Sequence, residues 1–248
     1  MQLIVHHRLQ TPLSLPINYH HMLQSIIFHA LEKDEQYSAF MHDCGFTRGK
    51  RNYKLFTFGL IKGKYRIEDK RIIFVEDVTF EIRSTERRLL ELLREQFEEK
   101  GITYGNQHCL GIKTELLDYQ VDTEEVIVRM NSPICVYSTD VETRKTMYYH
   151  PGDAEFCRRV NEGFRRRYEA YSGEREPGDI SIRINRISPK DKYVTCYKGI
   201  YITAWYGEYV LKGKKEYLDF LYQTGLGGKT SQGFGMFDVK SRSTSEDA

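Results

Sequence analysis

Paired cysteines, long apolar runs and a secretion signal are all missing from this sequence of 248 residues. The five cysteines stand singly, with no C-x-x-C pair and an odd total, which argues against a disulfide framework and against a structural zinc site. No stretch approaches the roughly 18 apolar residues of a membrane-spanning helix. The first ten residues lack a basic segment followed by an apolar run, so we expect a cytoplasmic protein with no membrane partner.

Clustered metal ligands and a strong overall charge are also lacking. We find no constellation of Asp, Glu and His residues with metal-ligand spacing, and we therefore expect neither a metal nor another cofactor. The net charge is only +2, so the whole molecule is not a polycation. A hydrophobic content of 40% with a charged content of 29% is typical of a soluble globular protein. At this length, two compact halves are the natural expectation.

Positive charge is instead concentrated in two segments. Residues 43–72 hold nine Lys or Arg against three acidic residues. A second cluster, of five arginines between Arg158 and Arg167, lies on a predicted helix. Local basic patches are expected where a protein binds a phosphate backbone, and a solvated surface is the ordinary alternative.

Hydrophobic periodicity predicts the same order of elements in both halves. In the first half we expect a strand at 2–9, a helix at 15–33, a strand at 53–61, a hairpin at 65–84, a helix at 84–101 and a strand at 102–119. In the second half we expect a strand at 125–138, a helix at 152–171, strands at 179–187 and 199–213, a helix at 214–224 and a strand at 234–240. A polar connector separates the first helix from the strand at 53–61, and the polar tail 241–248 is expected to fray.

This order is that of a β-α-β-β-α-β unit used twice. The sequence therefore predicts an α+β fold of two tandem ferredoxin-like (RRM-like) domains with antiparallel sheets. We place the domains at residues 1–120 and 125–248, with the seam near 118–125. In the second predicted helix of the first domain, the apolar stripe consists of Leu89, Leu90, Leu93 and Phe97.

The stretch TGLGGKTSQGFG, residues 224–235, invites comparison with a nucleotide-binding phosphate loop, GxxxxGK[ST]. The spacing fails, because the position five residues before Gly228 is Gln223 rather than glycine. The context fails as well, since a helix enters this loop and a strand leaves it. The helix end beside the loop is then a C-terminus, whose partial negative charge repels phosphate.

What remains is a loop rich in glycine that suits close approach to another molecule. Glycines let backbone amides come near a ligand and permit positive φ angles. A lysine and three hydroxyl or amide side chains in the loop could contact phosphate. A tight turn after a C-capping glycine is the structural alternative. The candidate residues for contact with a phosphate backbone are Arg48, Lys50, Arg51, Gly225, Gly227, Lys229, Thr230, Ser231, Gln232, Gly233 and Gly235.

The pattern GLGGKTSQGFG near the C-terminus resembles the signature of the CRISPR precursor-RNA-processing endoribonucleases of the repeat-associated RAMP superfamily. Three other stretches are similar to segments of that family: LPINYHHMLQSIIFHAL to its first helix, FMHDCGF with YKLFTFGL to its histidine-containing segment, and GIYITAWYGEYV to its penultimate strand pair. The resemblance covers nearly the whole chain.

The resemblance implies a metal-independent, sequence-specific endoribonuclease that cuts CRISPR precursor RNA within its repeats. In that reaction a ribose 2′-hydroxyl attacks the adjacent phosphorus and leaves a 2′,3′-cyclic phosphate and a 5′-hydroxyl. Two proton transfers and a cation for the charged phosphorane are needed. The matching positions imply that His42 is the general acid or base and that Lys54 stabilises the phosphate charge.

The sequence departs from the family at one position. A tyrosine on the first helix completes the site in some members, and Phe28, which cannot transfer a proton, is aligned with it here. His29 is its neighbour, and His21 lies on the same predicted helix face two turns earlier. Either histidine could replace the missing group, or His42 could act with Lys54 alone.

CRISPR repeat RNA is the expected partner, and an effector ribonucleoprotein complex and a homodimer are left open. The alternative function is a non-catalytic, RNA-binding RAMP subunit of an effector complex. A small-molecule enzyme of ferredoxin-like fold is a third reading, but it leaves the basic segments and the glycine loop unexplained.

Overall fold

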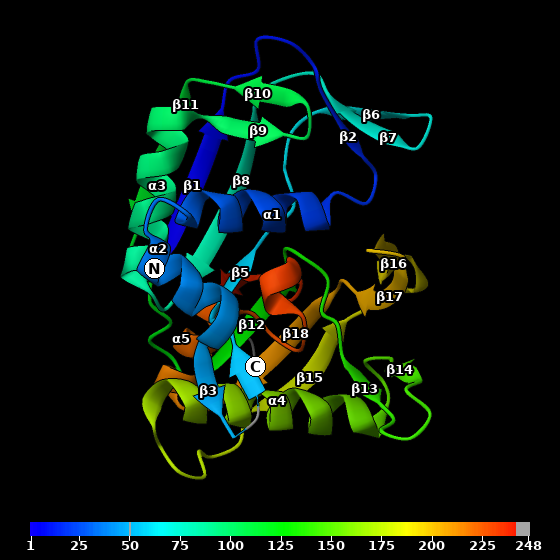
Figure 1. Cartoon of the computed structure of the whole chain (residues 1–248). Helices are drawn as coiled ribbons and strands as arrows, with labels where there is room; N and C mark the ends of the chain where they lie inside the picture. Colours follow the sequence, from blue (N-terminus) through cyan, green and yellow to red (C-terminus); the bar gives the residue numbers. More distant parts are fainter. Residues whose placement is uncertain (50, 242–248) are drawn as a thin grey trace.

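Two antiparallel four-stranded sheets, one in each half of the chain, form the framework of the molecule (Figure 1). The computed structural model describes residues 1–49 and 51–241, apart from the side chains of His42 and Ser241. The strand order is β11-β1-β8-β5 in the first sheet and β15-β18-β12-β19 in the second. In each, the first strand of the unit lies between the third and the fourth. This repeated topology confirms the predicted tandem ferredoxin-like fold.

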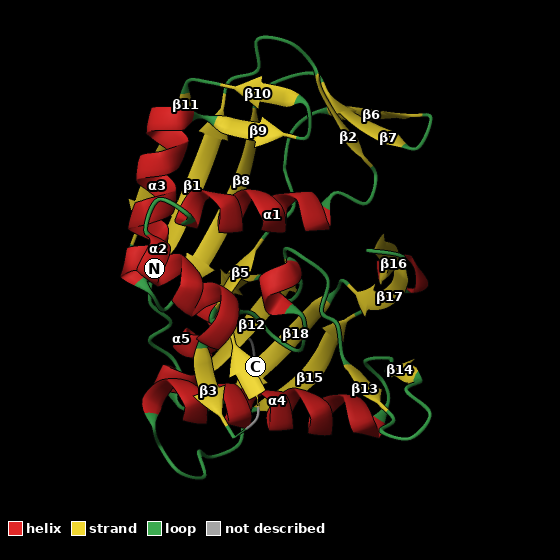
Figure 2. Cartoon of the chain, viewed as in Figure 1, coloured by secondary structure: helices red, strands yellow, loops and turns green. Residues whose placement is uncertain are grey.

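The first sheet is covered by two helices (Figure 2). Its strands are β1 (Gln2–His7), β5 (Phe56–Phe58), β8 (Val78–Ser84) and β11 (Ile112–Leu117), and its helices are α1 (His20–Leu31) and α3 (Arg87–Lys100). Burial alternates along β1, with Leu3 and Val5 inward, as expected for a sheet with one covered face. The whole predicted apolar stripe of α3 is buried in the same core.

Smaller elements are inserted between these strands. They are β2 (Leu13–Pro16), α2 (Glu35–Ala39), the π-helix η1 (Phe40–Cys44), β3 (Phe46–Arg48), β4 (Arg51–Tyr53), β6 (Tyr65–Glu68), β7 (Arg71–Phe74), β9 (Ile102–Tyr104) and β10 (Gln107–Cys109). The prediction of a simple connector after the first helix was wrong. Asp34 caps α2 by accepting a hydrogen bond from the backbone of Tyr37 at 3.0 Å, and the chain then turns through η1 into a short hairpin.

The second unit repeats the plan. Its strands are β12 (Glu125–Met130), β15 (Ser181–Arg186), β18 (Glu208–Lys212) and β19 (Phe237–Ser241), and its helices are α4 (Ala154–Ser172) and α5 (Lys215–Thr224). Two hairpins and two 3-10 turns extend it: β13 (Tyr137–Thr139) with β14 (Thr146–Tyr148), β16 (Lys192–Tyr197) with β17 (Ile200–Trp205), η2 (Pro189–Asp191) and η3 (Thr230–Gln232). Of the predicted tail, 241–248, Ser241 is the last residue of β19, and residues 242–248 lie outside the described residues.

A buried arginine ties the two halves together. Arg83, on β8 and only 1% exposed, donates to Glu81 in its own strand and to the backbone oxygen of Phe237 and the carboxylate of Asp238 on β19. Its guanidinium also lies 3.9 Å from the ring centroid of Tyr222.

Within residues 1–49 and 51–241, every helix is too short or too polar to span a lipid bilayer.

Candidate RNA-binding cleft

The glycine loop, residues 225–235, has a conformation that only glycine adopts easily. Gly225, Gly227, Gly233 and Gly235 have φ angles of 82°, 81°, 85° and 78°. A Cβ atom on Gly235 would lie 2.0 Å from the backbone oxygen of Leu226, and one on Gly233 would lie 2.5 Å from the ring of Phe58. Three of the four are buried, and Gly227 alone reaches the cleft described below. These glycines shape the loop.

Arg167 of α4 holds the start of the loop. Its guanidinium is buried and donates to the backbone oxygens of Thr224 at 3.1 Å and Gly225 at 2.8 Å, at the end of α5. The carbonyl end of a helix carries partial negative charge, so a guanidinium is stabilised there. Burial lowers the pKa of Arg167 to about 10, which still leaves it charged at neutral pH. The interpretation of this arginine cluster as solvated surface is therefore wrong for Arg167, which is buried.

Helix α1 holds the other end of the loop. The side-chain amide of Gln24 donates to the backbone oxygen of Ser231 at 2.8 Å. His20 contacts the backbone oxygen of Gln232 through Nδ1 at 3.2 Å and the hydroxyl of Tyr193 through Nε2 at 3.1 Å. A carbonyl oxygen only accepts, so the proton is assigned to Nδ1. Burial lowers the pKa of His20 to about 4.

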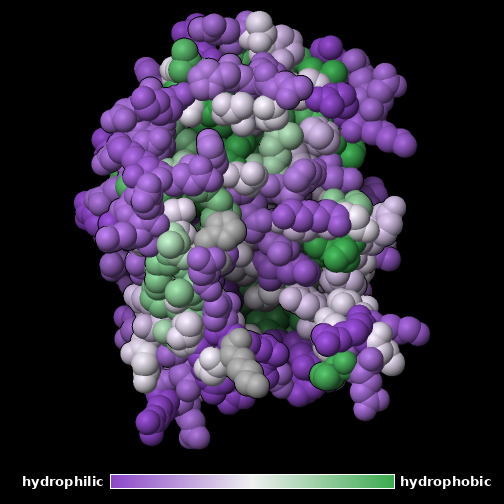
Figure 3. All heavy atoms as spheres, viewed as in Figure 1, coloured by the Kyte–Doolittle hydropathy of each residue, from purple (hydrophilic) through white to green (hydrophobic). Residues whose placement is uncertain are grey.

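A cleft of about 670 Å³ opens between the glycine loop, α4 and the two small hairpins β3–β4 and β13–β14. The face shown in Figure 3 is hollowed between the two halves, and mostly hydrophilic side chains border the hollow. Six basic residues line the cleft but only one acidic residue, Glu162, so its field is positive. The basic residues are Arg51, Lys54, Arg159, Arg166, Arg167 and Lys229.

Lys54 is the predicted catalytic residue that the structure places in this cleft. Its Nζ lies 4.6 Å from the ring centroid of Phe28, within the range of a cation–π contact. Phe28 in turn packs edge-on against Phe56, with 5.9 Å between the ring centroids. Partial burial lowers the pKa of Lys54, and the carboxylate of Asp43 opposes that shift. Phe28 therefore helps to fix the position of the lysine.

His42 belongs to the π-helix η1, directly before Asp43. Its side chain lies outside the described part of the chain. The π-helix ends at Gly45, which has a φ of 57°, and the side chain of Asn52 donates to the backbone oxygen of Asp43 at 2.8 Å. Asn52 is two residues before Lys54, so this hydrogen bond holds the segment that carries His42 beside the strand that leads to the lysine. Single π-turns are frequent at functional sites.

The two alternative histidines lie elsewhere. His21 and His29 line a second groove, of about 680 Å³, between α1, α3 and β9, and neither lines the cleft. His29 is largely exposed and pairs with Glu32 at 3.0 Å. The structure thus separates both histidines from the cleft that contains Lys54. Gln24, three positions after His21 and four before Phe28, is the residue of α1 that lines the cleft.

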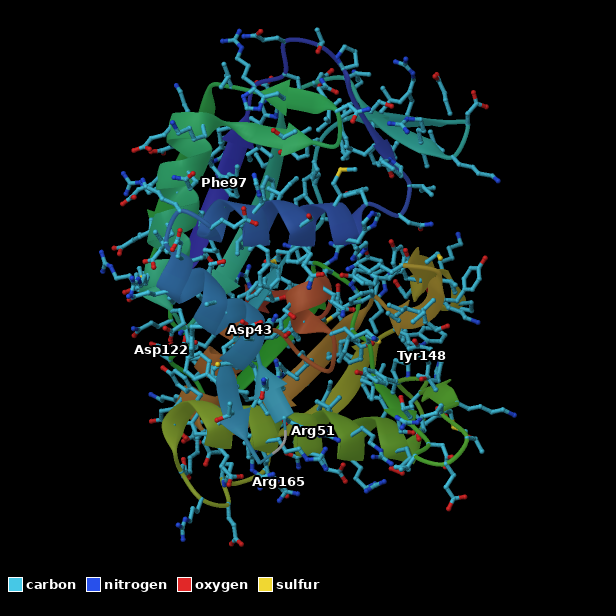
Figure 4. The ribbon with its side chains drawn as sticks, in the orientation of Figure 1. Asp43, Arg51, Phe97, Asp122, Tyr148 and Arg165 are labelled. Carbon is cyan, nitrogen blue, oxygen red and sulfur yellow. The ribbon has the colours of Figure 1, made fainter. Side chains whose placement is uncertain are left out.

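The predicted basic segments divide in the same way. Arg48 pairs with Glu169 of α4 and does not line the cleft, whereas Arg51 does, and Lys50 lies outside the described residues. Figure 4 shows Arg51 between the β3–β4 hairpin and α4. On α4, Arg158 pairs with Glu155 and Glu162. Many of the basic side chains are therefore neutralised on the surface.

The loop side chains also divide between the cleft and the interior. Lys229, Ser231 and Gln232 line the cleft, and the Nζ of Lys229 lies 4.8 Å from the ring centroid of Tyr137. Thr230 also borders the cleft, but it is buried, and its hydroxyl lies 3.4 Å from Arg167. Tyr137 and Tyr53 are cleft residues that the sequence did not single out, because alternating aromatics in a strand ordinarily indicate a core.

No group of three or more His, Cys, Asp or Glu side chains with metal-binding geometry occurs among the described residues. The arrangement that is present, basic and aromatic side chains around a rigid loop, suits a phosphate backbone with unstacked bases.

Two tandem ferredoxin-like units with a glycine loop beside a basic cleft define an α+β protein suited to binding a phosphate backbone. The family described as "CRISPR associated protein Cas6, C-terminal" matches residues 115–239, and the chain belongs to this family. It is 25% identical over 235 residues to the CRISPR-associated endoribonuclease Cas6 1 of Methanocaldococcus jannaschii, covering 90% of this chain and 86% of the relative.

Further relatives have the same family name or the same fold. The CRISPR-associated endoribonuclease Cas6 of Pyrococcus furiosus is 23% identical over 250 residues, covering 94% of this chain and 87% of the relative. The solved structure of a Cas6-related protein from Pyrococcus furiosus superposes with a TM-score of 0.79 at 23% identity, covering 98% and 99% of the two chains. A structure described as an RAMP protein binding different RNA substrates has a TM-score of 0.77 at 23% identity, covering 97% and 99%. These structures establish the shared fold.

Proposed function

We propose that this protein is an endoribonuclease that cuts CRISPR precursor RNA within its repeats. Membership of the Cas6 family and relatives named as CRISPR-associated endoribonucleases support this activity. The observation that carries the proposal is the convergence of Lys54, Arg51 and the glycine loop on one positively charged cleft. A single RNA strand in this cleft would have cations on both sides of its backbone.

The proposed reaction is an intramolecular transesterification without a metal. The 2′-oxygen bonds to the adjacent phosphorus as its proton passes to a base, and the bond from phosphorus to the 5′-oxygen breaks as that oxygen takes up a proton. His42 supplies one of the two proton transfers, because imidazole titrates near neutral pH. Lys54 stabilises the extra charge of the phosphorane. The products are a 2′,3′-cyclic phosphate and a 5′-hydroxyl.

Phe28 adds no proton donor to this site. Its contribution is the cation–π contact that holds the Nζ of Lys54 at 4.6 Å from its ring. His21 and His29 line another groove. We therefore propose a catalytic site of two residues, His42 and Lys54, which is assisted only by the geometry and contacts of the bound RNA. Such a site predicts slow turnover.

Repeat RNA is the proposed partner, and assembly into an effector ribonucleoprotein complex or a homodimer is a further proposal. The single cysteines, all free, fit work in the reducing cytoplasm. We also propose residues 1–120 and 125–248 as the two domains, with the cleft between them.

The test is cleavage of a labelled repeat RNA, taken from the CRISPR array of the source genome, in the presence of EDTA. Wild type, His42→Ala and His29→Ala are compared in single turnover, with His29→Ala as the control for loss of an exposed histidine. We expect one cut with a cyclic-phosphate end for wild type and His29→Ala, and loss of cutting in His42→Ala.

Other outcomes are equally informative. Cutting by His42→Ala at the wild-type rate would remove this residue from the reaction. Tight binding without cutting by any of the three proteins would favour the non-catalytic RNA-binding subunit, for which the phenylalanine at position 28 is the supporting observation. Absence of both binding and cutting would reject the proposed function.

A further inference from the structure

The cleft contains an arginine whose charge has no acidic partner among the described residues. The two buried arginines of the fold differ in this respect. Arg83 is paired with the carboxylates of Glu81 and Asp238. Arg167 donates only to neutral oxygens, those of Thr224, Gly225 and Thr230. A buried charge is costly unless it is compensated, and these oxygens supply only partial negative charges, so an anion bound here would complete the compensation at Arg167.

The neighbours of Arg167 are also incompletely satisfied. Four buried polar atoms without a hydrogen-bond partner come from residues that line this cleft: Nε of Arg167, Nε of Arg159, the hydroxyl of Tyr53 and Oε1 of Gln232. Three of them are donors, and the amide of Gln232 can present its NH₂ group by turning over. The hydroxyl of Tyr53 is near enough to Arg167 to influence the pKa of its guanidinium. Unsatisfied donors on residues that line one cleft point to an acceptor that is bound there.

We infer that Arg167 and Tyr53 form a subsite for one phosphodiester of the RNA backbone. This inference rests on the proposed function and specifies how the strand is held. A phosphate brings the negative charge that Arg167 lacks and accepts hydrogen bonds from several directions. It also couples binding to the glycine loop, because the same guanidinium holds Thr224 and Gly225.

The subsite is separate from the reacting phosphate. Lys54 is held against Phe28 on α1, whereas Arg167 is held against the end of α5. Arg167 therefore acts in binding and in positioning the loop, and we expect its loss to weaken affinity more than the rate of saturated enzyme.

Arg165 provides a matched control on the same helix. It pairs with Asp179 at 3.2 Å, does not line the cleft, and lies at the lower edge of the molecule in Figure 4. Removing this arginine changes the net charge by the same amount as removing Arg167. Tyr53→Phe removes only the unpartnered hydroxyl and keeps the ring packed in the second core.

The experiment measures binding of repeat RNA to full-length wild type, Arg167→Gln, Tyr53→Phe and Arg165→Gln at several salt concentrations. The RNA has a 2′-deoxy sugar at the cleavage position, so that it is bound without being cut. For one lost phosphate contact on a single strand, the slope of log K against log salt falls by about 0.7 in magnitude. We expect this change in Arg167→Gln, with about tenfold weaker binding, and no change in Arg165→Gln.

A methylphosphonate scan then locates the phosphate. In this scan each linkage in turn is made neutral, and one linkage should weaken binding to wild type but have little further effect on Arg167→Gln. If Arg167→Gln does not fold, Tyr53→Phe replaces it, and the loss at that linkage should shrink in this variant.

The proposed subsite would be rejected if wild type and the variants had the same salt dependence of RNA binding and the same response to each neutral linkage. Arg167 would then serve only to hold the loop. In that case wild type would still bind and cut the repeat RNA. If wild type neither binds nor cuts, the proposed function fails and the subsite fails with it.

Discussion

Phe28 influences what its neighbour Lys54 can do in the cleft. A tyrosine there would add a hydroxyl at the ring edge, whereas the phenylalanine offers only its ring, whose centroid lies 4.6 Å from the Nζ of Lys54. The lysine is held in place by a contact that contributes about 0.5–1 kcal/mol at a partly exposed site. In the proposed site, proton transfer then depends on His42 and on Lys54 itself.

We predict that Phe28→Tyr raises the single-turnover cleavage rate by at least about tenfold, because it adds a group that can transfer a proton. Phe28→Leu is the matched control, since it keeps an apolar side chain but removes the ring that faces Lys54. We expect it to be about two- to fivefold slower than wild type, from the lost cation–π contact. Cleavage by Phe28→Tyr at the wild-type rate would show that position 28 lies away from the reacting atoms.

At the scale of elements, α1 and the glycine loop behave as one unit. Gln24 and His20 give the loop two hydrogen bonds, and His20 stacks on Phe234 with 5.0 Å between the ring centroids. Neutral His20 satisfies both neighbours, by donating through Nδ1 and accepting the Tyr193 hydroxyl at Nε2. Protonation of Nε2 removes that acceptor inside a buried contact.

This contact predicts a pH-dependent stability. The pKa of His20 falls from 6.5 unfolded to about 4 folded, so the unfolded state binds the proton first as the pH drops. The stabilisation is complete above about pH 6.5 and is lost towards pH 4, by up to about 3 kcal/mol.

The pH dependence is measured by urea unfolding at pH values from 7.5 to about 4. The proteins compared are wild type, His20→Gln and His29→Gln, the last as a control for an exposed histidine. We expect a smaller acid-induced loss in His20→Gln than in the other two proteins. The same pH dependence in all three would contradict the prediction.

The regular elements could be predicted because their signals are local. Leu89, Leu90, Leu93 and Phe97 recur at helical spacing, and all four are buried on α3. The residues between 34 and 52 carry no such period, so α2 and the π-helix were missed; their bounds depend on capping by Asp34 and on the turn at Gly45. Local pattern specifies an element but says little about an irregular insertion.

The candidate site was only partly predictable for a different reason. The sequence identified Lys54, Arg51 and the loop residues, which meet in the cleft. Helical spacing does separate Arg167 from Arg165, because Arg167 follows the buried Val160 by seven positions, but it does not show what a buried polar side chain contacts. The same holds for His20, which is buried, and His21, which is exposed.

At the scale of the whole molecule, Arg83 couples the two halves. It joins β8 to β19 and contacts Tyr222 of α5, so the first sheet and the second unit share one buried charge network. Removing the guanidinium leaves Glu81 and Asp238 without their cation.

We predict that Arg83→Gln lowers the free energy of unfolding by about 3 kcal/mol and separates the unfolding of the two halves. The single tryptophan, Trp205 on β17, reports on the second half by fluorescence, whereas circular dichroism reports on the whole chain. In wild type the two urea transitions should coincide, and in Arg83→Gln they should separate.

Arg87→Gln, which breaks only an exposed pair with Glu91, serves as the control. Coincident transitions in Arg83→Gln would show that the halves are coupled in another way.

The loop that α1 holds lies some two hundred residues further along the chain: Gln24 and Ser231 are 207 positions apart. On the ribosome, therefore, the wall of the cleft that carries Arg51 and Lys54 is made long before the wall that carries Lys229. A nascent chain has no complete cleft until residues 225–235 have been synthesised and have folded back onto the first helix. The emerging protein thus cannot close this cleft around an RNA, its own message included, before that late step of its synthesis.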